Sequence, residues 1–116
     1  MTATAVQLWR AVCRFADLLP ERGVAALVDG VQVALFRTFD GDLHAVGNVD
    51  PFSGVSVLSR GIVGTRGGVP VVSSPLFKQA FDLTSGQCLD DADKRNPVYG
   101  VRLREGVVEV NVRGPS

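Results

Sequence analysis

Tight-turn signals recur at short intervals along this chain and restrict it to short antiparallel strands. Asp29-Gly30, Asp40-Gly41 and Glu105-Gly106 each separate two short segments of strand character. A two-residue hairpin turn requires positive φ, which glycine adopts at little steric cost and Asp tolerates better than most residues. Strands joined by such short turns are antiparallel neighbours, so the sequence predicts a series of hairpins.

The segments between the turns have the period of strands rather than helices. Trp9, Ala11, Cys13 and Phe15 fall on one side at a period of two, and the same alternation returns in residues 98–104. The predicted strands are residues 7–15, 24–28, 31–39, 43–47, 61–64, 69–73, 80–83, 87–89, 98–104 and 107–113. No long segment has the 3.6-residue period of an amphipathic helix, so we predict an all-β antiparallel barrel or sandwich.

Length and charge exclude several classes of function. The 116 residues suffice for one domain, which we assign to residues 1–116, and twelve basic side chains balance twelve acidic ones. A neutral chain offers no electrostatic reason to bind nucleic acid or an anionic membrane. No apolar run approaches the ~20 residues that span a bilayer, and the start lacks the pattern of a secretory signal. We therefore expect a cytoplasmic protein with no membrane partner.

The residues that most often carry chemistry are scarce. His44 is the only histidine and lies within a predicted strand, so we interpret it as a surface or half-buried residue rather than a catalytic base. Cys13 and Cys88 have no ligand-type neighbours at metal-site spacing. We interpret both as buried structural thiols; a disulfide between them stays open, although a cytoplasmic location disfavours it.

Two groups of acids are candidates for catalytic pairs. Asp40 and Asp42 flank a hairpin turn, and Asp90, Asp91 and Asp93 lie in a polar connection. Paired carboxylates run acid–base chemistry only where their surroundings separate their pKa values, which normally takes a cleft. We therefore interpret these acids as solvated.

A glycine-rich segment at residues 61–68 has the composition of a phosphate-binding loop but not its context. It lacks the Gly-Lys-Ser/Thr ending, and no helix follows to offer an anion-binding N-terminus. We interpret it as a hairpin turn. Pro70, just beyond it, cannot donate to a strand ladder and predicts that the second strand lies at an edge or starts beyond it.

Two loops in the middle of the chain carry a family resemblance. Residues 48–51 read Asn-Val-Asp-Pro, residues 74–78 read Ser-Pro-Leu-Phe-Lys, and a Phe-Asp-Leu-Thr-Ser-Gly hairpin follows at 81–86. This order resembles the Rieske ferredoxin-like domain, with a smaller cluster subdomain at about 48–89. Rieske proteins carry Cys-x-His in the first loop and Cys-Pro-x-His in the second. The four ligand positions are here Asn48, Asp50, Ser74 and Phe77.

The ligand count bears on the cluster without help from the family. A Rieske centre takes two thiolates on one iron and two imidazoles on the other. A chain with one histidine cannot supply them, and both cysteines lie outside the two loops. We therefore expect no iron–sulfur cluster and no other cofactor or metal in this chain.

A closer resemblance covers almost the whole sequence. The chain resembles the small subunit of assimilatory NAD(P)H-dependent nitrite reductases, Rieske-like proteins that lack the cluster. The segments that carry the resemblance are residues 9–13, 23–28, 33–36, 48–53, 58–64, 74–83 and 86–89. The resemblance implies that a large subunit carries FAD, iron–sulfur and sirohaem and reduces nitrite to ammonium, whereas this chain supports it without a catalytic side chain.

The implied role is a docking surface built from the two loops. Arginine and aromatic residues together are typical of interface hot spots. The candidate contacts are Asp50, Phe52, Arg60, Arg66, Phe77 and Lys78.

The sequence leaves two alternatives open. One is a ferredoxin-like electron-transfer component, against which the ligand count argues. The other is a free-standing Rieske-like module that binds a small ligand through Asn48, Asp50 and Ser74. These three side chains could instead hydrogen-bond the two loops to each other, which we favour.

Overall fold

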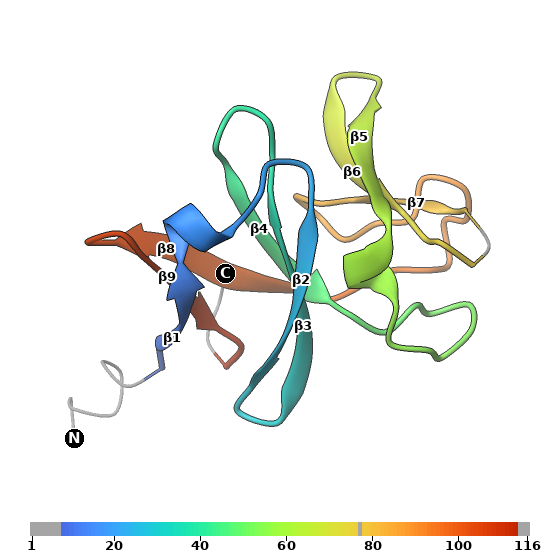
Figure 1. Cartoon of the computed structure of the whole chain (residues 1–116). Helices are drawn as coiled ribbons and strands as arrows, with labels where there is room; N and C mark the ends of the chain where they lie inside the picture. Colours follow the sequence, from blue (N-terminus) through green and yellow to red (C-terminus); the bar gives the residue numbers. More distant parts are fainter. Residues whose placement is uncertain (1–7, 77, 114–116) are drawn as a thin grey trace.

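The computed structural model describes residues 8–76 and 78–113 and contains antiparallel strands with two single 3₁₀ turns (Figure 1). The strands of the described residues are β1 (Arg10–Arg14), β2 (Gly23–Val28), β3 (Val31–Arg37), β4 (Leu43–Gly47), β5 (Ile62–Arg66), β6 (Val69–Ser73), β7 (Ala80–Asp82), β8 (Val98–Arg104) and β9 (Val107–Asn111). The 3₁₀ turns are η1 (Phe15–Asp17) and η2 (Leu58–Arg60). The prediction of an all-β fold is confirmed.

The larger sheet is a nearly closed barrel wall with the strand order β1-β9-β8-β4-β3-β2. Its inner face buries an aliphatic core: Leu18, Val28, Val33, Leu35, Ala45, Val108 and Val110. At one end of the seam between β1 and β2, the Asp29 carboxylate pairs with Arg10 (3.0 Å) and Arg113 (3.5 Å). These pairs hold the two edges of the sheet together at that end.

The smaller sheet, β5-β6-β7, lies against the outer face of the barrel and presents the two middle loops (Figure 1). A second core joins the sheets and contains Ala34, Phe36, Val46, Leu58, Val63, Val72, Phe81, Leu83 and Cys88. Strand β3 contributes to both cores because successive residues point to opposite faces of a sheet. The barrel is therefore the base on which the loop-bearing sheet is fixed.

The first strand departs from the predicted alternation. Its pairing with β9 shifts between Ala11 and Cys13, which is a β-bulge. A bulge adds one residue to a strand and reverses the alternation beyond it. Val12 and Cys13 consequently both pack against the barrel core, while Ala11 is exposed. The prediction that Ala11 lies on the same side of the strand as Cys13 was therefore wrong.

Pro70 also contradicts its prediction, because β6 is the central strand of the smaller sheet. Pro70 lies opposite Thr65, one pair beyond the hydrogen-bonded pair that closes the β5–β6 turn. Its nitrogen therefore faces away from β5 and towards β7. Strand β7 ends at Asp82, and Leu83 beyond it donates to the Pro70 carbonyl oxygen at 2.9 Å. The missing N–H thus interrupts no ladder.

The strand predicted at 87–89 is reduced to isolated bridges. Cys88 pairs with Phe81 and Gln87 with Arg95, without a continuous ladder. Gly86 ends the preceding turn at φ +80° and lies so close to the Asn96 main chain that a Cβ there would clash. This contact ties the 87–96 connection to the turn.

Candidate functional site

The two middle loops are joined by a buried hydrogen bond. The Ser74 hydroxyl donates to Asp50 Oδ2 at 2.6 Å, and the Phe52 amide donates to Oδ1 of the same carboxylate at 2.8 Å. Asp50 is 0% exposed and Ser74 is 1% exposed. Each carboxylate oxygen thus accepts one hydrogen bond, and the two donors come from different loops. Such bonds offset the cost of burying a polar group.

Asn48 performs a similar task at the base of the first loop. Its Oδ1 accepts the Ser59 amide at 2.7 Å, and its main chain bonds to Gln32 (3.1 Å) and Leu58 (3.0 Å). The residue therefore ties the end of β4 to η2. Asn48, Asp50 and Ser74 are all buried, so the hypothesis that they hydrogen-bond their surroundings together agrees with the geometry.

The second loop is a tight turn closed by its own main chain. The Ser74 carbonyl oxygen accepts the Lys78 amide at 2.9 Å, and the Ser74 amide donates to Gln79 at 2.9 Å. Lys78 adopts φ +64°, and Leu76 and Lys78 are exposed at the tip. Phe77, a predicted contact and ligand position, lies outside the described residues.

Phe52 connects the loops to the core and to a cation. Its ring is half-buried, 6.2 Å from the Phe81 ring centroid, and the Lys94 ammonium lies 5.6 Å above it. Such a cation–π contact keeps positive charge at the surface over the ring. Lys94 was missed from the sequence, because no local pattern places residue 94 beside residue 52.

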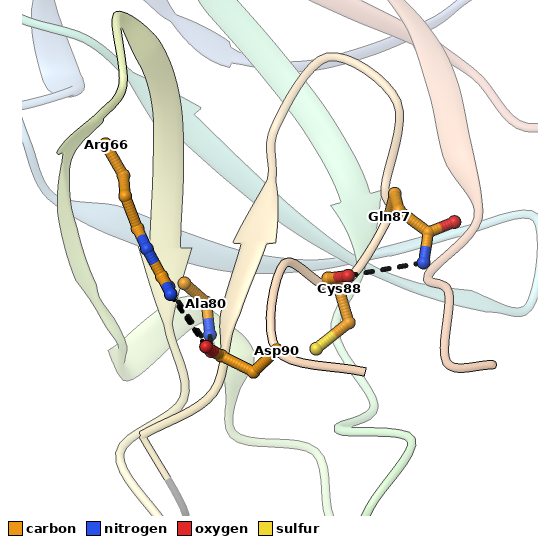
Figure 2. Close-up of polar contacts among 5 residues, drawn as sticks. All are labelled: Arg66, Ala80, Gln87, Cys88 and Asp90. Carbon is orange, nitrogen blue, oxygen red and sulfur yellow. Dashed lines mark hydrogen bonds and ion pairs between the residues drawn. The ribbon is translucent and has the colours of Figure 1, made fainter. Parts of the chain in front are cut away.

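Arg66 and Asp90 form a second junction at the side of the smaller sheet (Figure 2). The guanidinium of Arg66 bonds both carboxylate oxygens of Asp90, at 2.7 and 3.3 Å, and the Ala80 amide donates to Asp90 at 2.9 Å. These bonds, the Arg66 hydrogen bond first, lower the pKa of Asp90 to about 2. Asp90 is exposed, as the interpretation of a solvated acid predicted, but the sequence did not indicate that its carboxylate pairs with Arg66.

Gln87 fixes the connection that carries Asp90. Its side-chain amide nitrogen faces the carbonyl oxygens of Cys88, Asp91, Ala92 and Lys94 at 3.0–3.4 Å. Figure 2 shows the bond to Cys88 beside the Arg66–Asp90 pair. No sequence pattern indicates this role, because the carbonyl groups converge only in the folded loop.

A cleft of about 500 Å³ separates the β3–β4 turn from the β5–β6 hairpin and contains His44. His44 is half-buried, as predicted, and burial lowers its pKa. The Thr38 hydroxyl donates to Asp40 at 2.5 Å and lowers the pKa of that carboxyl. The imidazole therefore stays neutral and Asp40 stays ionised at pH 7. A carboxyl group that acts as a general acid needs a raised pKa, and the pKa of Asp40 is lowered instead.

The described residues, 8–76 and 78–113, contain neither a cluster of metal-ligating side chains nor a membrane-spanning helix. No three His, Cys, Asp or Glu side chains in this part of the chain come together as metal ligands would. Both cysteines are free thiols, Cys13 half-buried and Cys88 buried. No helix of the described chain is long and apolar enough to cross a membrane.

Comparison with known proteins gives this arrangement a family. The model of the Rieske-like [2Fe-2S] domain matches residues 8–111. The chain belongs to the Rieske-like domain family. A ferredoxin of carbazole 1,9a-dioxygenase from Nocardioides aromaticivorans IC177 shares the fold with a TM-score of 0.79 at 21% identity, over 90% of this chain and 98% of that one. The predicted Rieske-like fold is thus confirmed.

Closer relatives are nitrite reductase small subunits. The chain is 43% identical over 103 residues to the nitrite reductase (NADH) small subunit of Escherichia coli (strain K12), across 88% of this chain and 95% of that protein. A crystal structure from Mycobacterium tuberculosis, named for an NADH-dependent nitrite reductase small subunit, is 54% identical with a TM-score of 0.89 and covers 92% of this chain and 96% of its own. The chain is therefore a homologue of these subunits.

One relative has a different architecture. The chain is 36% identical over 102 residues to the nitrite reductase [NAD(P)H] large subunit of Klebsiella oxytoca, which covers 88% of this chain but 11% of that protein. In that organism, a domain like this one is part of a far longer polypeptide.

Proposed function

We propose that this chain is the small subunit of an NAD(P)H-dependent nitrite reductase and supports a large subunit that reduces nitrite to ammonium. The likeness to the E. coli small subunit carries the proposal, because it spans 95% of that protein rather than a shared fragment. The Klebsiella large subunit adds support, since a domain like this one is covalently joined there to a chain of that name. The proposal includes a cytoplasmic location and FAD, iron–sulfur and sirohaem in the large subunit.

We infer further that the chain itself holds no [2Fe–2S] cluster. Thiolates and imidazoles are the donors that such clusters take. At three of the corresponding loop positions the chain offers an amide, a carboxylate and a hydroxyl, from Asn48, Asp50 and Ser74. Asp50 and Ser74 bond each other directly at 2.6 Å, which closes the space between the loops. The residues present therefore do not fit the cluster, and no electron-transfer step is assigned to this chain.

The same contacts weigh against the two alternatives. A ferredoxin-like component needs the redox centre that these donors do not fit. A small ligand held by Asn48, Asp50 and Ser74 would have to compete with hydrogen bonds that these side chains already make. A docking role uses the loops in the conformation they have.

We place the docking surface on the outer side of the two loops. Arg60 and Lys78 are exposed and have no ion pair among the described residues, and Phe52 and Leu76 add apolar area beside them. Asp50, a predicted contact, is withdrawn because its side chain is completely buried. Arg66 remains a candidate contact, because half of its side chain is exposed, although its guanidinium is paired with Asp90. Phe77 stays a prediction.

Co-expression with the candidate large subunit tests the proposal. We expect the two chains to co-purify and nitrite-dependent NADH oxidation to require both. Reversing charge in Arg60→Glu and Lys78→Glu should weaken binding at least tenfold, while Arg104→Glu on the distant β8–β9 hairpin should leave it within twofold. Rates and retention that do not depend on this chain would contradict the subunit role. An iron-loaded, coloured preparation of the isolated chain would contradict the absence of a cluster.

A further inference from the structure

The barrel seam, which consists of residues 10–13 of β1 and residues 24–29 of β2 and its turn, is closed without a ladder. Strands β1 and β2 are the two ends of the sheet order, and within residues 8–76 and 78–113 no main-chain hydrogen bond joins them. Their Cα atoms nevertheless approach within 8 Å, and a groove of about 500 Å³ lies between the two strands. The contacts that close the seam are therefore made by side chains.

Asp29, in the β2–β3 turn, provides the polar contact across the seam. Its carboxylate is paired with Arg10 Nε of β1 at 3.0 Å and with Arg113 Nε, just beyond β9, at 3.5 Å. The Asp29 side chain is 18% exposed, so water screens these pairs less than it screens fully exposed ones. In the described part of the chain, no other ion pair crosses the seam.

The opposite end of the seam is closed by the chain itself. Residues 15–22 connect β1 to β2, and Arg37 of β3 fixes this connection. The Arg37 guanidinium donates to the Leu18 carbonyl oxygen at 2.8 Å and lies 4.1 Å from the centroid of the Phe15 ring. Strand β1 also has its ladder with β9. The seam can therefore widen at the Asp29 end, with residues 15–22 as the hinge.

We propose that the Asp29 ion pairs are a latch and that the seam opens locally when they break, while the smaller sheet stays folded. Apolar packing also crosses the seam, because Val12, Cys13 and Val28 share one core, but such packing is non-directional and does not fix the two edges in register. Opening exposes the Cys13 thiol. Burial, and to a smaller extent the charge of Asp17, raises the pKa of this thiol, so Cys13 is a weak nucleophile while the seam is closed. The latch does not depend on the proposed function.

The two cysteines are natural reporters of this opening. Cys13 lines the seam, whereas Cys88 is buried in the core that joins the two sheets. A bulky maleimide should label Cys13 at least tenfold faster than Cys88, with each rate divided by its value in the unfolded chain. Low urea should raise the Cys88 rate steeply and the Cys13 rate little, because local opening exposes little new surface. Equal rates with equal urea dependence would overturn local opening.

Removal of the latch charge tests the role of Asp29. Asp29→Asn retains a residue that tolerates the φ of 48° at this position, and it should raise the Cys13 rate about fivefold while the Cys88 rate stays within twofold. The matched control is Glu109→Gln. Glu109 is also paired with an arginine, at 2.6 Å, and its side chain is 19% exposed, but the pair joins β8 to β9. This control should leave the Cys13 rate within twofold.

Salt gives a readout in the wild-type chain. Raising NaCl from about 0.05 M to about 1 M screens the latch and should raise the Cys13 rate about twofold, with no such rise in Asp29→Asn. An unchanged Cys13 rate in Asp29→Asn, or an equal rise in Glu109→Gln, would overturn the latch. A parallel rise at Cys88 in Asp29→Asn would assign the effect to global stability and also overturn it. Wild-type Cys13 that reacts as fast as in the unfolded chain would show a seam that is already open, with the same consequence.

Discussion

The Ser74–Asp50 hydrogen bond is the contact on which the loop arrangement most depends. The change Ser74→Ala removes the donor and leaves Asp50 Oδ2 buried without a partner in a site where both residues are at most 1% exposed. A hydrogen bond to a charged group contributes about 1.5–3 kcal/mol, and the cost of an orphaned buried group lies at the upper end of that range or beyond it. We therefore expect Ser74→Ala to lower the free energy of unfolding by about 3 kcal/mol.

Such a loss would leave a folded but weakened protein. Small domains have about 5–15 kcal/mol of stability in total, and 1 kcal/mol corresponds to roughly 3–6 °C in Tm at this size. Urea unfolding at pH 7 should show the loss, and Tm should fall by about 10–15 °C. The matched control is Ser53→Ala, which removes only a local bond to the Val55 amide at 3.1 Å and should cost about 0.5–1 kcal/mol.

A double-mutant cycle separates the contact from the side chains. Each single change leaves the other side chain buried without its hydrogen-bond partner, whereas the double change leaves neither. The double variant should therefore lose at least 1 kcal/mol less free energy of unfolding than the sum of Asp50→Ala and Ser74→Ala. Additive effects, or a loss below 0.5 kcal/mol for Ser74→Ala, would refute the reasoning that this bond is the main link between the two loops.

Two further predictions concern the second hairpin and its connection. Gly86→Ala should lower the free energy of unfolding by at least about 3 kcal/mol, because the new Cβ would clash with the main chain at φ +80°. The control Gly30→Ala, at φ +81° in open space, should lower it by about 1 kcal/mol. Equal losses in urea unfolding would contradict the steric argument. The pKa of Asp90 falls from 3.8 to about 2 on folding, so its stabilisation is complete above about pH 4 and disappears as the pH falls through 2. Thermal unfolding of wild type and Asp90→Asn should therefore differ at pH 6 and converge near pH 2, and a constant difference would exclude this linkage.

Hairpins are the part of the fold that local sequence predicts well. Asp29-Gly30 and Glu105-Gly106 set their turns because few other residue pairs adopt the required φ values. Alternation then assigns the faces of β8 and β9, since both faces of a strand are set by a period of two. The two middle loops could be recognised because their order along the chain is itself a family pattern.

Local pattern was misleading where a neighbouring strand decides the outcome. The bulge in β1 is a property of its pairing with β9, so the period of residues 9–15 gave Ala11 the wrong side. Pro70 lies in a central strand because β7 ends before it would need the missing N–H. Asp90 is an exposed loop acid, as predicted, but its hydrogen bonds to Arg66 and the Ala80 amide could not be predicted, because only the fold brings these groups together.

The sequence by itself determined the all-β class, the positions of the hairpins and the membership of the Rieske-like family. The proposal that the chain holds no Rieske centre also starts from the sequence, because the residue types at the loop positions are read from it directly. Only the tertiary structure decided that Asp50 and Ser74, 24 residues apart, meet as a buried pair. The physical reason is that turns and alternation depend on neighbours along the chain, whereas burial and hydrogen-bond partners depend on which distant segments the fold brings together.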